Sequence, residues 1–341
     1  MTPALLAAAA LAACKDAAGP GTVDTGALTA KLGAVTTTFQ SNIAYRSLTE
    51  LAGRFPQFGG TALLRRMAPS PHSLPAPFGP ATLAQLGPQP GPSDLQALFP
   101  ADALGKTYEW NVATDTYEAT ARTGAPGTGI RIILYTVDPF SQPAEPLAEL
   151  GYVDLTDEST ASADQLGVLL RLASTTIADY SITVATATGW ERSTAAGYIT
   201  QTSGSGRVDF DLMQYFDYTT YGGDWESTLT PEAGGQVVIE SHSTSSGAPI
   251  QTLISVSDGP GTVAISATDA FGSVTGQVSF NGTVVASLAF PVGGPLTIMD
   301  ANGRQLTEQE REDVTWIYAH AWADLVVVSL VRAFRPGFVV F

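Results

Sequence analysis

The sequence predicts a mainly β protein: a long antiparallel meander, forming a curved sheet, half-barrel or sandwich, with an N-terminal and a C-terminal helix. From residue 106 onward, apolar and polar residues alternate repeatedly, which is typical of strands with one buried and one wet face. Turn-forming residues are abundant, with 34 glycines and 22 prolines. Hydrophobic residues make up 44% of the chain and charged residues 14%, which indicates a packed globular protein.

The clearest alternation lies between Arg207 and Asp217. The residues predicted to be buried there are Val208, Phe210, Leu212 and Phe216, and those predicted to face water are Asp209, Asp211, Met213 and Asp217. A second strand is predicted for Gly129–Val137, with Ile130, Ile132 and Leu134 on one face.

Two hairpins are predicted from their turns. Asn281-Gly282 suits a two-residue turn between Ser273–Phe280 and Thr283–Phe290. Asp258-Gly259-Pro260-Gly261 is predicted to join residues 252–257 to 262–268. A regular register across the first turn places Val285 and Ala289 on the same face as Val274 and Val278.

A helix is predicted before the strands, from Val23 to about Phe55. Its apolar residues recur at spacings of three and four, which puts one stripe on one helix face: Leu28, Leu32, Val35, Phe39 and Ile43. This stripe is predicted to pack on the protein core.

A second helix is predicted near the C-terminus, where Thr307 and Glu310 have the spacing of a capping box. The apolar face of this helix comprises Val314, Ile317, Ala321, Leu325 and Val328. Residues 325–334 are apolar nearly all round, so this end is predicted to be buried, either as helix or as a final strand.

Composition divides the chain into four segments. Residues 1–13 are predicted to be a signal peptide, 14–55 a tether with the amphipathic helix, and 106–341 the antiparallel β domain with its C-terminal helix. Residues 56–105 contain ten prolines, which remove backbone donors and fix φ. This segment is therefore predicted to be an extended connector.

An export signal is indicated by an apolar stretch that ends in Leu11-Ala12-Ala13-Cys14. These residues resemble the lipobox of bacterial lipoprotein signal peptides. The resemblance implies that the Cys14 thiol is diacylated, that the leader is cut before Cys14, and that the new amino group is acylated, for example with palmitate. Several acyl chains would make the membrane a stable partner. Lys15, in place of the Asp that retains lipoproteins at the inner membrane, favours the outer membrane.

Bulk charge and cysteine content exclude several classes of function. The formal net charge of −16 argues against nucleic acid as a partner, because phosphates would be repelled. Cys14 is the only cysteine, so a mature chain has no internal disulfide or thiolate metal site.

Residues with catalytic or metal-binding chemistry are sparse. His72, His242 and His320 are the only histidines, and none lies beside a serine elbow or at the spacing of a metal motif. Asp209 and Asp211 share one strand face, which is better explained as a solvated surface than as a cation site. No cofactor is predicted, and an enzyme is less favoured than a binding protein.

One aromatic cluster is a weak candidate for ligand binding: Tyr215, Tyr218, Tyr221 and Trp225. Asp217 and Asp224 lie between these residues, and aromatics with carboxylates can stack on sugars or cover a hydrophobic ligand. The alternative is an ordinary strand end and hairpin with cross-strand aromatic pairs.

Three functions follow as hypotheses. The first is a non-catalytic envelope lipoprotein with a binding or structural role, whose partner is another envelope protein. The second is a carrier or sensor of a hydrophobic ligand or lipid, with an apolar cavity between sheet and terminal helix; its architecture would be similar to the half-barrels of lipoprotein carriers. The third, least favoured, is an envelope hydrolase.

Overall fold

A computed structural model describes the following parts of the 341-residue chain: 23–51, 54, 98–140, 142–187, 189–217, 219–220, 222–244, 248–270, 272–301 and 305–323. The predicted signal peptide with Cys14 lies outside these residues. So do residues 56–97 of the predicted connector, together with Leu325 and Val328.

The described residues form one sheet of 15 strands, ordered β15-β14-β13-β12-β11-β10-β9-β8-β7-β6-β5-β4-β3-β1-β2. The strands are β1 Thr107–Asn111, β2 Thr116–Thr120, β3 Gly129–Tyr135, β4 Glu149–Asp157, β5 Asp164–Leu172, β6 Thr175–Ala187, β7 Trp190–Ile199, β8 Val208–Asp217, β9 Gly222–Pro231, β10 Gln236–Ser243, β11 Ile250–Asp258, β12 Gly261–Ala270, β13 Ser273–Phe280, β14 Thr283–Phe290 and β15 Thr297–Asp300.

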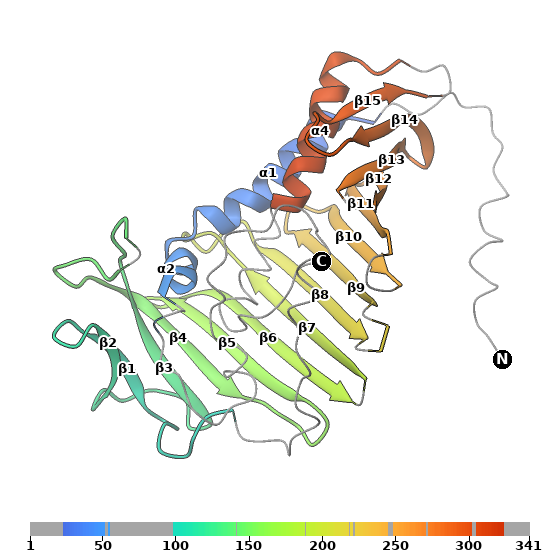
Figure 1. Cartoon of the computed structure of the whole chain (residues 1–341). Coiled ribbons are helices and arrows are strands. Elements are labelled where there is room, and N and C mark those ends of the chain that lie inside the picture. Colours follow the sequence, from blue (N-terminus) through green and yellow to red (C-terminus); the bar gives the residue numbers. More distant parts are fainter. Residues whose placement is uncertain are drawn as a thin grey trace.

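This sheet confirms the predicted antiparallel meander. From β3 to β15 each strand pairs with the next one in the chain, and only β1 and β3 pair in parallel. The two edges, β2 and β15, do not meet, so the sheet is open. Figure 1 shows that it is strongly twisted and curved. A single sheet also means that, of the architectures predicted, the sandwich is wrong.

In the described part of the chain, three helices lie beside the sheet: α1 Thr25–Gln40, α2 Ile43–Leu51 and α4 Glu308–Ala323. α1 contacts β9, β11 and β12, and α2 contacts β3, β4 and β5 (Figure 1). We call the sheet face that carries α1 and α2 the inner face, and the opposite one the outer face. Side chains along each strand therefore alternate between the inner face, where α1 and α2 lie against part of the sheet, and the outer face.

The alternation in β8 is as predicted. Val208, Phe210 and Leu212 are at most 4% exposed, and they point to the inner face. Asp209 and Asp211 point to the outer face. Period-two patterning thus identifies the faces of this strand, because side chains alternate along an extended backbone.

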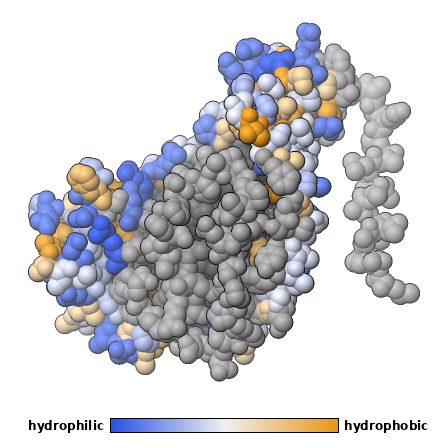
Figure 2. All heavy atoms as spheres, in the orientation of Figure 1, coloured by the Kyte–Doolittle hydropathy of each residue, from blue (hydrophilic) through white to orange (hydrophobic). Residues whose placement is uncertain are grey.

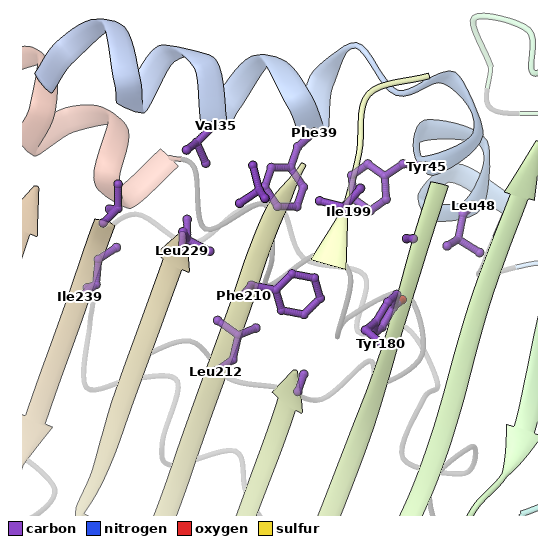
Figure 3. Packing of buried hydrophobic residues seen from close by; sticks show 14 of the residues in the cluster. Val35, Phe39, Tyr45, Leu48, Tyr180, Ile199, Phe210, Leu212, Leu229 and Ile239 are labelled. Carbon is purple, nitrogen blue, oxygen red and sulfur yellow. The ribbon is translucent and has the colours of Figure 1, made fainter. Parts of the chain in front are cut away.

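The core fills the space between the helices and the inner face. Figure 3 shows Val35 and Phe39 of α1 above Phe210 and Leu229, and Tyr45 and Leu48 of α2 nearer to Tyr180. Phe210 and Tyr180 pack edge to face with ring centroids 5.6 Å apart. Each large apolar side chain buried in this way contributes about 1.5–3 kcal/mol to the free energy of unfolding.

The predicted N-terminal helix is interrupted at Asn42. The Asn42 Oδ1 accepts a hydrogen bond from the Tyr45 N–H at 2.8 Å, which caps a new helix, α2. Its Nδ2 donates to the Thr200 carbonyl at 2.6 Å, which ties the break to the end of β7. The stripe from Leu28 to Phe39 is buried as predicted, but Ile43 is 41% exposed because the second helix has its own direction.

The hairpin β13–β14 has the predicted strands but not the predicted register. Val278 pairs with Ala286 and not with Val285, because a bulge adds one residue to β14. Beyond the bulge, each side chain of β14 lies on the opposite face from the one that a regular register predicts. The prediction that Ala289 shares a face with Val278 is therefore wrong.

The predicted capping box begins α4. The Glu310 N–H donates to Thr307 Oγ1 at 3.2 Å, and the Thr307 N–H donates to Glu310 Oε2 at 2.9 Å. Val314 and Ile317 are fully buried, and α4 packs against α1. None of the described helices combines the length and the apolar character needed to cross a membrane.

Candidate functional site

The outer face is hollowed across β9–β13 into a trough of about 710 Å³. Ten of its lining residues point their side chains outward, and the antiparallel register arranges them in two rows. The first row is Asp224, His242, Gln251, Thr268 and Thr275; the second is Glu226, Glu240, Leu253, Ser266 and Gln277. Five strands at a spacing of about 4.8 Å make the rows about 19 Å long.

One end of this trough, on β9 and β10, is acidic. His242 lies directly opposite Asp224, and its Nδ1 is hydrogen-bonded to the Asp224 carboxylate. Glu226 lies directly opposite Glu240. Side chains facing each other in this way have Cβ atoms about 4.5–5.5 Å apart, so the two glutamates repel.

The charge of the two glutamates is not compensated within the described part of the chain. Neither Glu226 nor Glu240 has a basic side chain within 4.0 Å among those residues. Both residues are exposed to solvent. The acidic end therefore has unpaired negative charge that is accessible from outside.

The other end of the trough, on β11–β13, is neutral. Gln251 and Gln277 offer amide donors and acceptors, and Ser266, Thr268 and Thr275 offer hydroxyls. Leu253 adds one apolar side chain between the two ends. This half can form hydrogen bonds to polar groups of a ligand, and it does not discriminate between positively and negatively charged ligands.

The predicted aromatic cluster is divided between the two faces of the sheet. Tyr215 lies on the outer face opposite Asp224, beside the acidic end of the trough. Its ring centroid is 6.1 Å from that of Trp190. Trp225 lies opposite Gln214, on the inner face, and is only 3% exposed. These two residues therefore do not form one stacking platform.

The remaining two members of that cluster, Tyr218 and Tyr221, lie outside the described residues. Of the three histidines, His72 also lies outside them. His320 is stacked on Trp316 in α4, with ring centroids 3.9 Å apart. Its Nδ1 lies 2.9 Å from the Trp316 carbonyl.

The described parts of the chain contain no cluster of side chains suited to binding a metal ion. No three His, Cys, Asp or Glu side chains there are grouped so that they could hold a metal ion. Asp209 and Asp211 share the outer face of β8, as predicted, but Asp209 is hydrogen-bonded to Arg207.

Among the described residues, the Asp224–His242 pair has no hydroxyl group directly across from it on the neighbouring strands. On the outer face, the cross-strand neighbours of His242 are Asp224 and Gln251, and neither has a hydroxyl group. The first hydroxyl of that row, on Thr268, lies two strands away, about 9–10 Å. A serine-hydrolase arrangement needs a nucleophile within hydrogen-bond reach of the base.

Sequence reasoning missed this trough, because its side chains come from five strands and form no local motif. Part of the trough could have been found from the two predicted hairpin turns. A turn sets the register of its two strands, and the register shows which outward residues lie opposite each other. No family model, no curated protein and no solved structure matches this chain.

Proposed function

We propose that this protein is a lipid-anchored, non-catalytic binding protein of the bacterial cell envelope that holds its partner in the outer trough. The observation that carries the proposal is the trough itself, a hollow of about 710 Å³ whose outward side chains, from five adjacent strands, are polar except for Leu253. Hollows of this size fall within the range that holds small ligands or short chain segments. The anchor rests on the lipobox-like residues that end at Cys14.

A binding role is supported over an enzymatic one by the chemistry of the lining. The imidazole of His242 has a carboxylate partner but no hydroxyl directly opposite it. The trough instead presents uncharged hydrogen-bonding groups beside uncompensated carboxylates, which is a recognition surface rather than a constellation around one reacting atom.

A hydrophobic-ligand carrier remains the alternative, and its site would be the inner face. Beside α1 and α2 that face is occupied by packed side chains, including Phe210, Tyr180 and Leu229 (Figure 3). On the described surface shown in Figure 2, hydrophobic residues occur in small separate groups among hydrophilic ones. Native mass spectrometry would favour the carrier if a lipid mass remained bound after purification without added lipid.

The anchor is tested by metabolic labelling with an alkyne analogue of palmitate. We expect the wild-type chain to be labelled and the Cys14→Ser variant to be unlabelled and released from membranes. Lys15→Asp should remain labelled but move from the outer to the inner membrane fraction. A wild-type chain that takes up no label would refute the anchor.

The binding surface is tested in cells by placing the photo-crosslinker benzoylphenylalanine at single positions. Gln251 lies in the trough, whereas Gln236 is an exposed outward residue at the opposite end of the adjacent strand β10. We expect one discrete adduct from position 251 and none from position 236. The absence of an adduct at 251, or equal yields at both positions, would contradict a partner in the trough.

A further inference from the structure

The shape of the trough limits what can occupy it. Its rows run across five strands for about 19 Å and are only two side chains wide. An extended peptide covers that length with about six residues at about 3.3 Å each. A narrow, extended occupant therefore fits better than a compact one.

The acidic end determines the sign of the charge that the occupant carries there. Asp224, Glu226 and Glu240 place three carboxylates on two adjacent strands, with the imidazole of His242 as the one nitrogen base of the lining. An anionic occupant would be repelled. A cation placed between Glu226 and Glu240 would relieve the repulsion between them, so charge complementarity favours a cationic group.

A neighbouring aromatic pair supports the same occupant. Tyr215 lies directly opposite Asp224 and close to Trp190, so aromatic rings flank the acidic end on the β8 side. Ammonium and guanidinium groups bind favourably against such rings. The same kind of contact occurs elsewhere on the outer face, where the Arg207 guanidinium lies 3.8 Å from the centre of the Tyr198 ring.

The lining favours a peptide over a sugar. Sugar sites usually stack a ring face on an aromatic side chain. The rings of Tyr215 and Trp190 border only the acidic end, and Trp225, the one tryptophan among the lining residues, has its side chain on the inner face. The amides and hydroxyls of the neutral half match the alternating N–H and C=O groups of an extended backbone.

We propose that the trough binds an extended segment of another envelope protein, with lysine or arginine side chains at the β9–β10 end and uncharged residues over β11–β13. This inference rests on the proposed binding function and names its partner class. Glu226 and Glu240 hold the basic side chains, Tyr215 borders them, and Gln251 and Gln277 bind the backbone beyond them.

The test is fluorescence anisotropy with the full-length chain in detergent and two labelled peptides. The first peptide is Lys-Lys-Ser-Ala-Thr-Ala, and the second has glutamate in place of both lysines. We expect saturable binding of the lysine peptide alone, with an affinity that falls as NaCl rises. The double variant E226Q/E240Q should weaken binding about tenfold, the effect of losing two partly exposed ion pairs.

The matched control is D102N/D179N. Asp102, in the turn before β1, and Asp179, on β6, are exposed carboxylates, so this variant makes the same change of net charge outside the trough. It should change the affinity less than about twofold, since distant exposed charges are screened. Equal losses in both double variants would overturn the inference.

Other outcomes separate this inference from the proposed function. If adducts form at position 251 but the protein binds a neutral chito-oligosaccharide or the glutamate peptide instead, the peptide assignment is overturned and the binding function stands. If no adduct forms there and neither peptide binds, both are overturned.

Discussion

Two regions of the outer face differ in whether their carboxylates are paired with a basic side chain. On β3 and β4, Arg131 Nε and Nη2 each donate a hydrogen bond of 2.7 Å to the Asp154 carboxylate. The guanidinium also lies 3.6 Å from the centre of the Tyr152 ring. On β9 and β10, Glu226 faces Glu240, and within the described parts of the chain neither has a cationic partner.

This difference distinguishes charges that stabilise the fold from charges that remain available to a binding partner. The Arg131 and Asp154 side chains are 17% and 11% exposed, and the hydrogen bonds that Arg131 donates to the Asp154 carboxylate raise the pKa of Arg131. A bidentate, largely buried pair of this kind has satisfied its own hydrogen-bonding capacity. The glutamates of the trough gain nothing from each other, so their placement costs stability unless a cation binds between them.

The largest expected effect comes from breaking the compensated pair. Arg131→Met should lower the free energy of unfolding by about 2–3 kcal/mol, because it leaves the Asp154 carboxylate largely buried without its partner. Urea unfolding followed by circular dichroism measures the change. The control is Arg207→Met, at the exposed Arg207–Asp209 pair, which should cost less than about 1 kcal/mol. Equal losses would remove the contrast between the two kinds of pair.

A smaller effect of opposite sign is expected in the trough. E226Q/E240Q should raise the free energy of unfolding by about 0.5–1 kcal/mol, because it removes two like charges that lie directly opposite each other. D102N/D179N provides the matched control and should change stability less than E226Q/E240Q. A loss of stability in E226Q/E240Q would show that the glutamates contribute to the fold rather than strain it.

The smallest effect concerns the ion pair between Arg122 and Glu149, whose contribution to the free energy of unfolding depends on pH. Hydrogen bonds from Arg122, at 2.8 and 2.9 Å, lower the pKa of Glu149 in the folded protein. The stabilising contribution is therefore fully present above the ordinary pKa of glutamate, about 4.3, and is lost as pH falls through the lower folded value. Arg122→Met should reduce stability by a few tenths of a kcal/mol near neutral pH and by less in acid.

The measurement is the urea midpoint of wild type and variant at about pH 7 and about pH 3. Arg192→Met serves as the control, because Arg192 is exposed and has no ion pair within the described residues. Its effect should be the same at both pH values. A difference between wild type and Arg122→Met that grows in acid would contradict the direction of the Glu149 shift.

Local chemistry made part of the fold predictable. The capping box at Thr307 and Glu310 and the turn at Asn281-Gly282 depend on a few neighbouring residues, and both occur where they were expected. The break at Asn42 was not predictable from periodicity, because its amide is held by the Thr200 carbonyl, 158 residues away in sequence. The bulge at Val285 was not predictable either. Both faces of β14 carry apolar residues, so a change of face along the strand leaves no sign in the apolar pattern.

Turn chemistry and period-two patterning act over short distances, so the antiparallel meander with helices at both ends is predictable from the sequence alone. The sequence also contains the Cys14 motif from which an envelope anchor is proposed. The positions of Trp225 on the inner face and Tyr215 on the outer face, and the pairing of Glu226 with Glu240, are visible only in the folded protein. These outcomes depend on the register between strands and on the curvature of the sheet, which are set by packing of the whole inner face rather than by neighbours in the chain.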